Sequence, residues 1–93
     1  MIISFRNKDT EKIWNQEFTK KYPNEIQRIA LRKLLMIHGA YNLNDLKVTP
    51  GNKLESLKGI RKGQYSIRIN AQWRICFKWE ENNASFVEIT DYH

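Results

Sequence analysis

The first part of the chain shows hydrophobic spacings typical of a strand and then of two helices. The opening letters MIISF indicate a short strand. A helix is expected from about Glu11, with Asp9 or Thr10 as its N-cap. A longer helix is expected between Pro23 and Gly39, because apolar residues recur there every three or four positions and Gly39 can end the helix in a left-handed conformation. The apolar side of the first helix is expected to hold Ile13, Trp14 and Phe18.

Residues 40–57 lack a sustained hydrophobic period and predict a connector. Asn44 can cap a short helical turn over the three residues that follow it. The run Thr49–Asn52 carries a proline and a glycine in succession, which is typical of a turn. Leu54 and Leu57 are expected to anchor the connector to the hydrophobic core.

The last third of the chain alternates apolar and polar residues with period two, which predicts three antiparallel strands. The first strand is expected over residues 64–70, the second over 73–79, and the third around Val87 and Ile89. Together with the earlier elements, this order predicts an α+β fold, in which an N-terminal strand and two helices pack on an antiparallel sheet. The side chains expected to face the core are Tyr65, Ile67, Ile69, Trp73, Ile75, Phe77, Trp79, Val87 and Ile89.

Length and composition are consistent with a single folded domain over residues 1–93. The chain has 41% hydrophobic and 28% charged residues, which suits a soluble globular protein. No apolar run approaches the roughly 20 residues that a membrane span requires. Since the N-terminus lacks a signal-peptide pattern and Cys76 has no second cysteine to pair with, a reducing cytoplasm is expected.

Positive charge is concentrated in the middle of the chain. Residues 47–78 hold eight lysines and arginines against one acid, Glu55, whereas residues 79–93 hold four acids and no lysine or arginine. A dense basic block in a small domain indicates a polyanionic partner, most commonly a nucleic acid. A basic surface that only keeps the protein soluble is an equal alternative on charge alone.

The predicted strands bring several of these basic residues together. Arg68 lies near the end of one strand and Arg74 near the start of the next, and both alternate with the core-facing residues. We therefore expect both arginines on the face that the core does not cover. The basic loop Lys58–Lys62 leads into the first of these strands, and the final residues Asp91–His93 end the third strand beside them. A concave basic surface with a proton-transfer cluster at its rim is the expected result.

Such a surface has the groups that metal-independent RNA cleavage needs. That reaction requires a base for the 2′-hydroxyl, cations for the phosphate and an acid for the leaving 5′ oxygen. The candidate catalytic residues are Lys58, Arg68, Arg74, Asp91, Tyr92 and His93. The candidate RNA-binding residues are Lys53, Arg61, Lys62, Asn70, Gln72 and Lys78. Two histidines and one cysteine do not make a convincing zinc site, and no cofactor is expected. A C-terminal histidine is more often a frayed tail than a catalytic group.

Three segments resemble a known family of toxins. The opening MIISF, the segment LESLKGIRKGQYSIRINAQWRICFKW and the ending VEITDYH are similar to HigB-type toxins of the RelE/ParE superfamily. The resemblance implies a microbial-ribonuclease-like fold and a type II toxin that cuts mRNA in the ribosomal A site. It also implies a helix-turn-helix antitoxin of the HigA type as partner. The positions that match the family's functional residues are Lys58, Arg74, Asp91, Tyr92 and His93.

The sequence departs from this family at two positions. Some relatives carry an arginine where Asn70 stands, and Arg68 on the same strand face is expected to reach the same phosphate. Some relatives carry a histidine where Glu55 stands, and a carboxylate there would repel phosphate, which argues against a catalytic role for this position.

Two other functions remain compatible with the sequence. ParE-type relatives share the fold and poison DNA gyrase, but their pattern lacks the terminal histidine and the arginine pair, so His93 favours the ribonuclease. A plain RNA-binding module, in which His93 is idle, is the other alternative.

Overall fold

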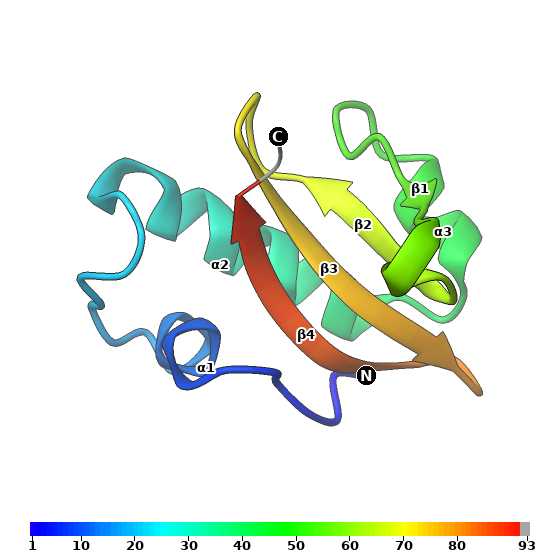
Figure 1. Cartoon of the computed structure of the whole chain (residues 1–93), viewed down its shortest axis with the longest axis horizontal. Helices are drawn as coiled ribbons and strands as arrows, with labels where there is room; N and C mark the ends of the chain where they lie inside the picture. The colour runs from blue at the N-terminus through cyan, green and yellow to red at the C-terminus, as the bar shows by residue number, and fades with distance from the viewer. Residues whose placement is uncertain (92–93) are drawn as a thin grey trace.

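The computed structural model describes residues 1–91 and shows a four-stranded antiparallel sheet with the long helix α2 across one face (Figure 1). The strands lie in the order β1-β2-β3-β4, so each pairs with its neighbour in sequence. The predicted α+β fold is therefore confirmed. The elements are α1 (Lys8–Trp14), α2 (Asn24–Gly39), α3 (Leu43–Lys47), β1 (Glu55–Ser56), the 3₁₀ turn η1 (Gly59–Arg61), β2 (Gln64–Arg68), β3 (Trp73–Glu80) and β4 (Asn83–Asp91).

The N-terminal segment pairs with β4 but does not form the expected strand. It makes isolated parallel bridges from Ile2 to Ala84 and from Phe5 to Val87. Between these two contacts β4 is irregular, because the pairing of β3 with β4 shifts register there and Phe86 has a φ of 52°. A β-bulge of this kind interrupts the ladder, so a continuous strand cannot pair along it.

Two helices begin at asparagine caps that the sequence reasoning missed. Helix α1 is capped by Asn7, whose Oδ1 accepts a hydrogen bond from the Thr10 amide at 2.8 Å. The expected caps Asp9 and Thr10 lie inside this helix, and the Thr10 hydroxyl is buried and accepts from the Ile89 amide at 3.0 Å. Helix α3 is capped by Asn42 rather than the expected Asn44.

The boundaries of the helices differ in two further ways from the sequence prediction. Helix α1 ends at Trp14, so Phe18 lies beyond it and is 63% exposed instead of packing with the core. Helix α2 starts after Pro23 and includes Gly39 as its last residue, while Ala40 follows in an extended conformation. Gly39 therefore does not adopt the left-handed conformation, because the chain leaves the helix through a buried extended residue.

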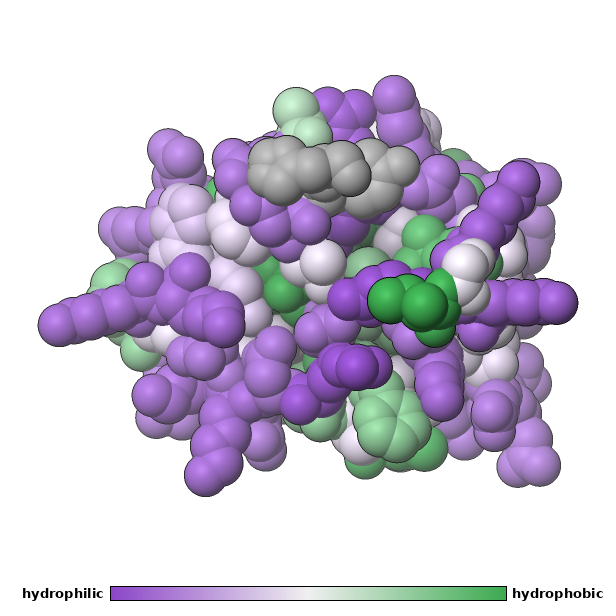
Figure 2. Space-filling view, viewed as in Figure 1, coloured by the Kyte–Doolittle hydropathy of each residue, from purple (hydrophilic) through white to green (hydrophobic). Residues whose placement is uncertain are grey.

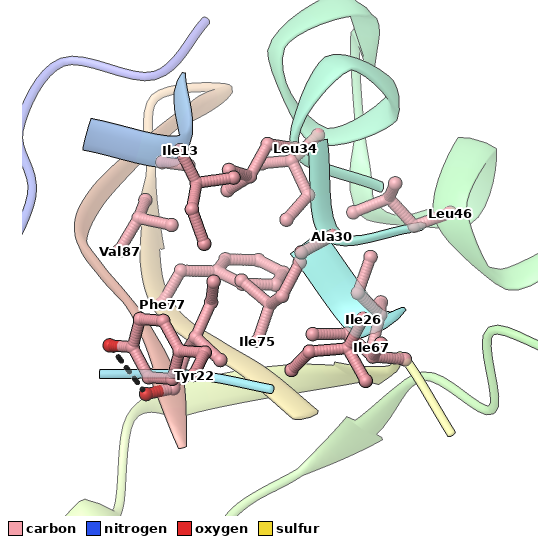
Figure 3. Packing of buried hydrophobic residues seen from close by; sticks show 14 of the residues in the cluster. Ile13, Tyr22, Ile26, Ala30, Leu34, Leu46, Ile67, Ile75, Phe77 and Val87 are labelled. Carbon is pink, nitrogen blue, oxygen red and sulfur yellow. Dashed lines mark hydrogen bonds between the residues drawn. The ribbon is translucent and has the colours of Figure 1, made fainter. Parts of the chain in front are cut away.

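The core lies between α2 and the sheet (Figure 3). Phe77 of β3 is fully buried, and its ring lies among residues from α2, α1 and the neighbouring strands. Tyr22 closes one end of the cluster, and its hydroxyl donates to the Ile89 carbonyl oxygen at 3.4 Å. The α2 residues in this core are Ile26, Ala30, Leu34 and Ile37. The residues of the three predicted strands that were expected to face the core all belong to this cluster or pack against it, and so does Leu54 of the connector, but Leu57 does not.

Within residues 1–91, no helix has both the length and the hydrophobicity needed to cross a lipid bilayer. The face of the sheet that points away from α2 is mostly hydrophilic (Figure 2).

Candidate active site

The β2–β3 hairpin places two arginines directly opposite one another. Arg68 at the end of β2 is the register partner of Arg74 in β3, and Thr90 of β4 completes the row. As the sequence predicts, both arginines alternate with Ile67 and Ile75, which are fully buried in the core. Like charges at directly opposed positions repel each other. An anion between the two guanidinium groups would relieve this repulsion, so the pair favours a site for a phosphate.

The Arg74 side chain is held rigidly rather than exposed. Its Nε donates to Ser66 Oγ at 2.7 Å, and its Nη2 donates to the Lys53 carbonyl oxygen at 2.7 Å. The Glu55 carboxylate lies 3.7 Å from the same Nε. The residue is only 6% exposed, because the connector before β1 passes against this end of the sheet. Arg74 therefore lies on the predicted side of the sheet. The prediction that this side is open to solvent is wrong at Arg74, because the connector covers it.

A pocket opens beside this arginine. It has a volume of about 270 Å³ and is lined by Lys53, Arg68, Asn70, Ala71 and Arg74. Pockets for small ligands begin at about 300 Å³, so this one suits a single phosphodiester group rather than a large cofactor. Three of its five lining residues are cationic and none is acidic. Within residues 1–91, no carboxylate lies within ion-pair distance of Lys53 or Arg68.

Other predicted RNA-contacting residues lie at the opposite end of β2. The Leu57 amide donates to the Gln64 carbonyl oxygen at 2.9 Å, which places Lys58 near the start of this strand. Arg68 lies four residues further along, or about 13 Å at the rise of a β-strand. Lys58 and Lys62 are exposed there. The structure therefore does not bring the Lys58–Lys62 loop to the arginine pocket as one continuous concave surface.

Two predicted RNA-binding side chains at this end of the sheet have other partners. Arg61 forms an ion pair with Glu88 at 2.8 Å and donates to Gln64 Oε1 at 3.2 Å. Lys78 lies opposite Gln64 in the β2–β3 ladder, and its ammonium stands over the Phe86 ring, 5.0 Å from the centroid. A contact with RNA would have to compete with these interactions.

Asp91 lies at the correct end of the sheet but on the other face. It pairs with Trp73 in the β3–β4 ladder, next to the pair formed by Arg74 and Thr90. Because successive side chains of a strand point to opposite faces, Asp91 shares the face of Trp73 and not that of the arginines. Its carboxylate accepts a hydrogen bond from the Gln72 side-chain amide at 3.1 Å. The structure thus separates Asp91 and Gln72 from the arginine pocket.

The remaining two predicted catalytic residues, Tyr92 and His93, lie outside the described residues. Their roles in proton transfer stay predictions.

Asn70 shapes the tip of the β2–β3 hairpin. Its Oδ1 accepts hydrogen bonds from the Gln72 amide at 2.9 Å and from the Trp73 amide at 2.8 Å. An asparagine that satisfies turn amides in this way fixes the turn locally. The sequence reasoning assigned Asn70 to RNA binding, and the structure adds that it positions one wall of the pocket.

Sequence reasoning missed three buried polar residues near the pocket: Ser66 accepts a hydrogen bond from Arg74, the Asn52 carbonyl oxygen accepts one from the Arg68 amide, and Lys33 donates to Asn52 Oδ1. Ser66 could have been found, because it alternates in phase with Arg68 on β2. Lys33 also left a signal, since it occupies a position in the buried stripe of α2 where the spacing predicts an apolar residue. Asn52 gave no signal, because the connector has no periodicity.

The chemistry of the neighbouring groups limits the reactions that the site supports. Burial raises the pKa of the Cys76 thiol, so this residue stays protonated and is not an activated nucleophile. Among residues 1–91, no group of three or more histidine, cysteine, aspartate or glutamate side chains is arranged to hold a metal ion. The pocket offers three cations, of which Arg74 is held by hydrogen bonds, and these suit electrostatic stabilisation of a phosphate.

Comparison with known proteins identifies the family. The family model for the RelE-like toxin of the type II toxin–antitoxin system HigB matches residues 3–93. The chain is 34% identical over 85 residues to Toxin HigB-1 of Vibrio cholerae serotype O1, and the match covers 90% of each chain. It is also 34% identical over 94 residues to Endoribonuclease HigB of Proteus vulgaris, with 100% of both chains covered.

Solved structures show the same fold at lower identity. The YoeB–YefM complex from Staphylococcus aureus matches with a TM-score of 0.62 and 22% identity, covering 100% of this chain and 95% of that chain. YafQ from Escherichia coli strain BL21(DE3) matches with a TM-score of 0.60 and 15% identity, covering 98% of this chain and 91% of that chain. The resemblance inferred from the sequence motifs is confirmed, and the chain belongs to the HigB family of RelE-like toxins of type II toxin–antitoxin systems.

Proposed function

We propose that this toxin is a metal-independent endoribonuclease that cleaves mRNA in the ribosomal A site and so stops translation and growth. The observation that carries the proposal is the pocket in which Lys53, Arg68 and Arg74 surround a space of about 270 Å³. The name of the Proteus vulgaris relative, Endoribonuclease HigB, supports the same reaction.

The proposed reaction is an in-line displacement at phosphorus. The 2′-oxygen loses its proton to a base and forms a bond to the adjacent phosphorus, while the bond from phosphorus to the 5′ oxygen breaks. The leaving 5′ oxygen takes a proton from an acid, so the products are a 2′,3′-cyclic phosphate and a free 5′-hydroxyl. His93 is the proposed proton carrier, and Tyr92 is proposed to orient the target nucleotide.

The arginine pocket would stabilise the charge that develops on the phosphate oxygens. Arg74 is already fixed by its bonds to Ser66 and Lys53, so little reorganisation is needed when that charge forms. Arg68 and Lys53 would supply the other two positive charges. Because Lys58 lies at the other end of β2, we propose that it and Lys62 hold the RNA backbone at a second point.

Asp91 is a weaker candidate for the catalytic base than His93. The strand alternation puts its carboxylate on the face opposite Arg74, and Gln72 already donates to it. We propose that Asp91 instead orders the end of β4, beside the hairpin that carries Asn70.

Type II membership implies an antitoxin that neutralises the toxin. We propose a helix-turn-helix partner of the HigA type, with the translating ribosome and its mRNA as targets, all in the cytoplasm. A solved relative of the same fold is a complex of YoeB with YefM, which supports a protein partner for this chain as well.

The experiment is cleavage of mRNA on programmed ribosomes by the purified protein, followed by mapping of new 5′ ends. Arg68→Ala should reduce cleavage by about 100-fold, since removal of one transition-state donor costs about 10²–10³ in rate. Arg28→Ala is the matched control, because Arg28 is exposed on α2 and lies outside the pocket. Full cleavage by Arg68→Ala would refute the proposed role of the pocket.

The same preparations separate the alternative functions. A gyrase poison would leave the mRNA intact and change DNA supercoiling. An RNA-binding module would retain RNA in a salt-sensitive way without new ends at any pH. Either result would overturn the ribonuclease.

A further inference from the structure

A buried lysine on α2 reaches the connector that forms one wall of the arginine pocket. Lys33 is only 7% exposed, and its ammonium donates a hydrogen bond to Oδ1 of Asn52, which is fully buried. Within residues 1–91, no carboxylate forms an ion pair with this ammonium. Burial lowers the pKa of Lys33, and repulsion from Arg32 lowers it further. A buried cation without a counter-charge destabilises the fold, so its presence suggests a role other than stability.

Asn52 joins three elements through its polar groups. Its Oδ1 accepts from Lys33 of α2, and its Nδ2 donates to the Leu46 carbonyl oxygen of α3 at 3.0 Å. Its own carbonyl oxygen accepts from the Arg68 amide of β2 at 2.6 Å. The backbone at Asn52 is therefore held between two helices and the strand that carries one of the pocket arginines.

The next residue, Lys53, turns the chain so that it reaches the second arginine. Its φ of 45° lies in the left-handed region, which is unfavourable for a residue with a side chain. In this conformation its carbonyl oxygen accepts from Arg74 Nη2 at 2.7 Å, and its own side chain lines the pocket. Strained residues of this kind persist where their surroundings hold them in place. The anchored residue beside Lys53 is Asn52.

We propose that Lys33 and Asn52 are positioning residues that fix the backbone at Lys53 and, through its carbonyl group, the guanidinium of Arg74. Neither Lys33 nor Asn52 lines the pocket, so they act on the phosphate site only through these bonds. The predicted effect on RNA cleavage rests on the proposed function, whereas the predicted effect on the position of the Arg74 guanidinium does not.

The direct test measures hydrogen exchange by ¹⁵N NMR at the Arg74 Nη2–H group, which donates to the Lys53 carbonyl oxygen. The resonance is assigned by its loss in Arg74→Lys. Lys33→Met and Lys33→Gln both shorten the side chain by one bond, but Lys33→Met removes the hydrogen-bond donor and Lys33→Gln keeps one. We expect exchange to be slowest in the wild type, intermediate in Lys33→Gln and fastest in Lys33→Met, with a span of about tenfold or more. Any other order overturns the inference.

A matched control separates positioning from a general loss of charge on α2. Arg32→Met removes the neighbouring cation from an exposed position and should leave the exchange of the Arg74 group unchanged. Ile13→Val trims a core residue far from the connector and reports the effect of reduced stability alone. If either control accelerates exchange as much as Lys33→Met does, the inference is wrong. If Lys33→Met does not fold, the comparison of Lys33→Gln with the wild type decides in the same way.

Cleavage kinetics give the second readout. Lys33→Met should lower kcat by about tenfold, because a displacement of ~1 Å at a reacting group can cost ~100-fold. KM should change by less than about threefold, because the variant keeps every cationic side chain that lines the pocket and so still attracts the RNA. An unchanged kcat together with unchanged Arg74 exchange refutes the positioning role. If the wild type cleaves no RNA, the proposed function fails, and the order of exchange rates still decides the inference about Lys33.

Discussion

Arg74→Lys keeps the positive charge at this position but replaces the planar guanidinium, which has several separate donors, with a single ammonium group. The guanidinium places Nε on Ser66 Oγ and Nη2 on the Lys53 carbonyl oxygen, both at 2.7 Å. A single ammonium nitrogen cannot occupy both positions, so at least one of these charge-assisted hydrogen bonds is lost. Such a bond contributes about 1.5–3 kcal/mol to the free energy of unfolding. The lysine keeps the positive charge that pairs with Glu55. Because Glu55 is partly exposed, this ion pair contributes at most about 1 kcal/mol to the free energy of unfolding.

We therefore expect Arg74→Lys to lower the free energy of unfolding by about 1.5–3 kcal/mol, measured by urea denaturation. A small domain with 5–15 kcal/mol of stability, roughly, stays folded after this loss. Cleavage of mRNA on ribosomes should fall by about 10²–10³ because the phosphate loses a fixed donor. Arg6→Lys, at an exposed position 3.7 Å from Glu88, is the matched control and should change stability by less than about 0.5 kcal/mol. A variant Arg74→Lys with wild-type stability and wild-type cleavage would refute the reasoning.

Three further predictions concern the fold around the site. Phe77→Ala empties the centre of the core and should cost about 3–5 kcal/mol in urea denaturation, and a loss below about 1 kcal/mol would contradict the packing described. Asn7→Ala removes the cap of α1 and should cost about 1 kcal/mol, whereas Asn44→Ala, at the cap position expected from the sequence, should cost less than half as much. Because burial raises the pKa of Cys76, the unfolded chain loses this proton first as the pH rises above about 8.5, and the folded state is destabilised there. Unfolding measured between pH 8 and 10 should show a steeper loss of stability for the wild type than for Cys76→Ala, and equal slopes would contradict the burial of the thiol.

The period-two pattern predicted the part of the site that depends on strand geometry alone. It placed Arg68 and Arg74 together on the face away from the core, because side chains alternate along each strand of a hairpin. The same alternation puts Thr90 on the face of the arginines and therefore puts the next residue, Asp91, on the opposite face. The expectation that Asp91 lies beside the arginines came from its position in the sequence and not from the alternation.

The parts that could not be predicted depend on contacts between distant segments. Lys53 approaches Arg74 only because its backbone takes a left-handed conformation, which no local pattern in a connector indicates. Lys33 contacts Asn52 across 19 residues of sequence. Both caps were misplaced for a related reason: several residues near each helix start are good caps, and tertiary contacts decide which one is used. Thr10 illustrates this, because its hydroxyl is engaged with the Ile89 amide of β4.

The placement of the basic residues has a consequence for how RNA would be bound. The pocket at the Arg68 end of β2 and the loop at the Lys58 end are about 13 Å apart along the strand. An RNA strand that runs along β2 would engage both, with one phosphate in the pocket and another at the loop. This geometry favours an extended, unpaired substrate over a compact duplex contact at one point.

The central claim is that the arginine pocket holds a phosphodiester of the RNA while the adjacent 2′-oxygen of the same RNA strand attacks the phosphorus and displaces the 5′ oxygen. The chemistry of the new RNA ends tests this claim most directly, because the proposed displacement leaves a 5′-hydroxyl. After incubation of the purified protein with programmed ribosomes, the new 5′ ends should be ligated to an adapter only after treatment with a polynucleotide kinase. Ends that are ligated without the kinase would carry a 5′-phosphate and would contradict the mechanism.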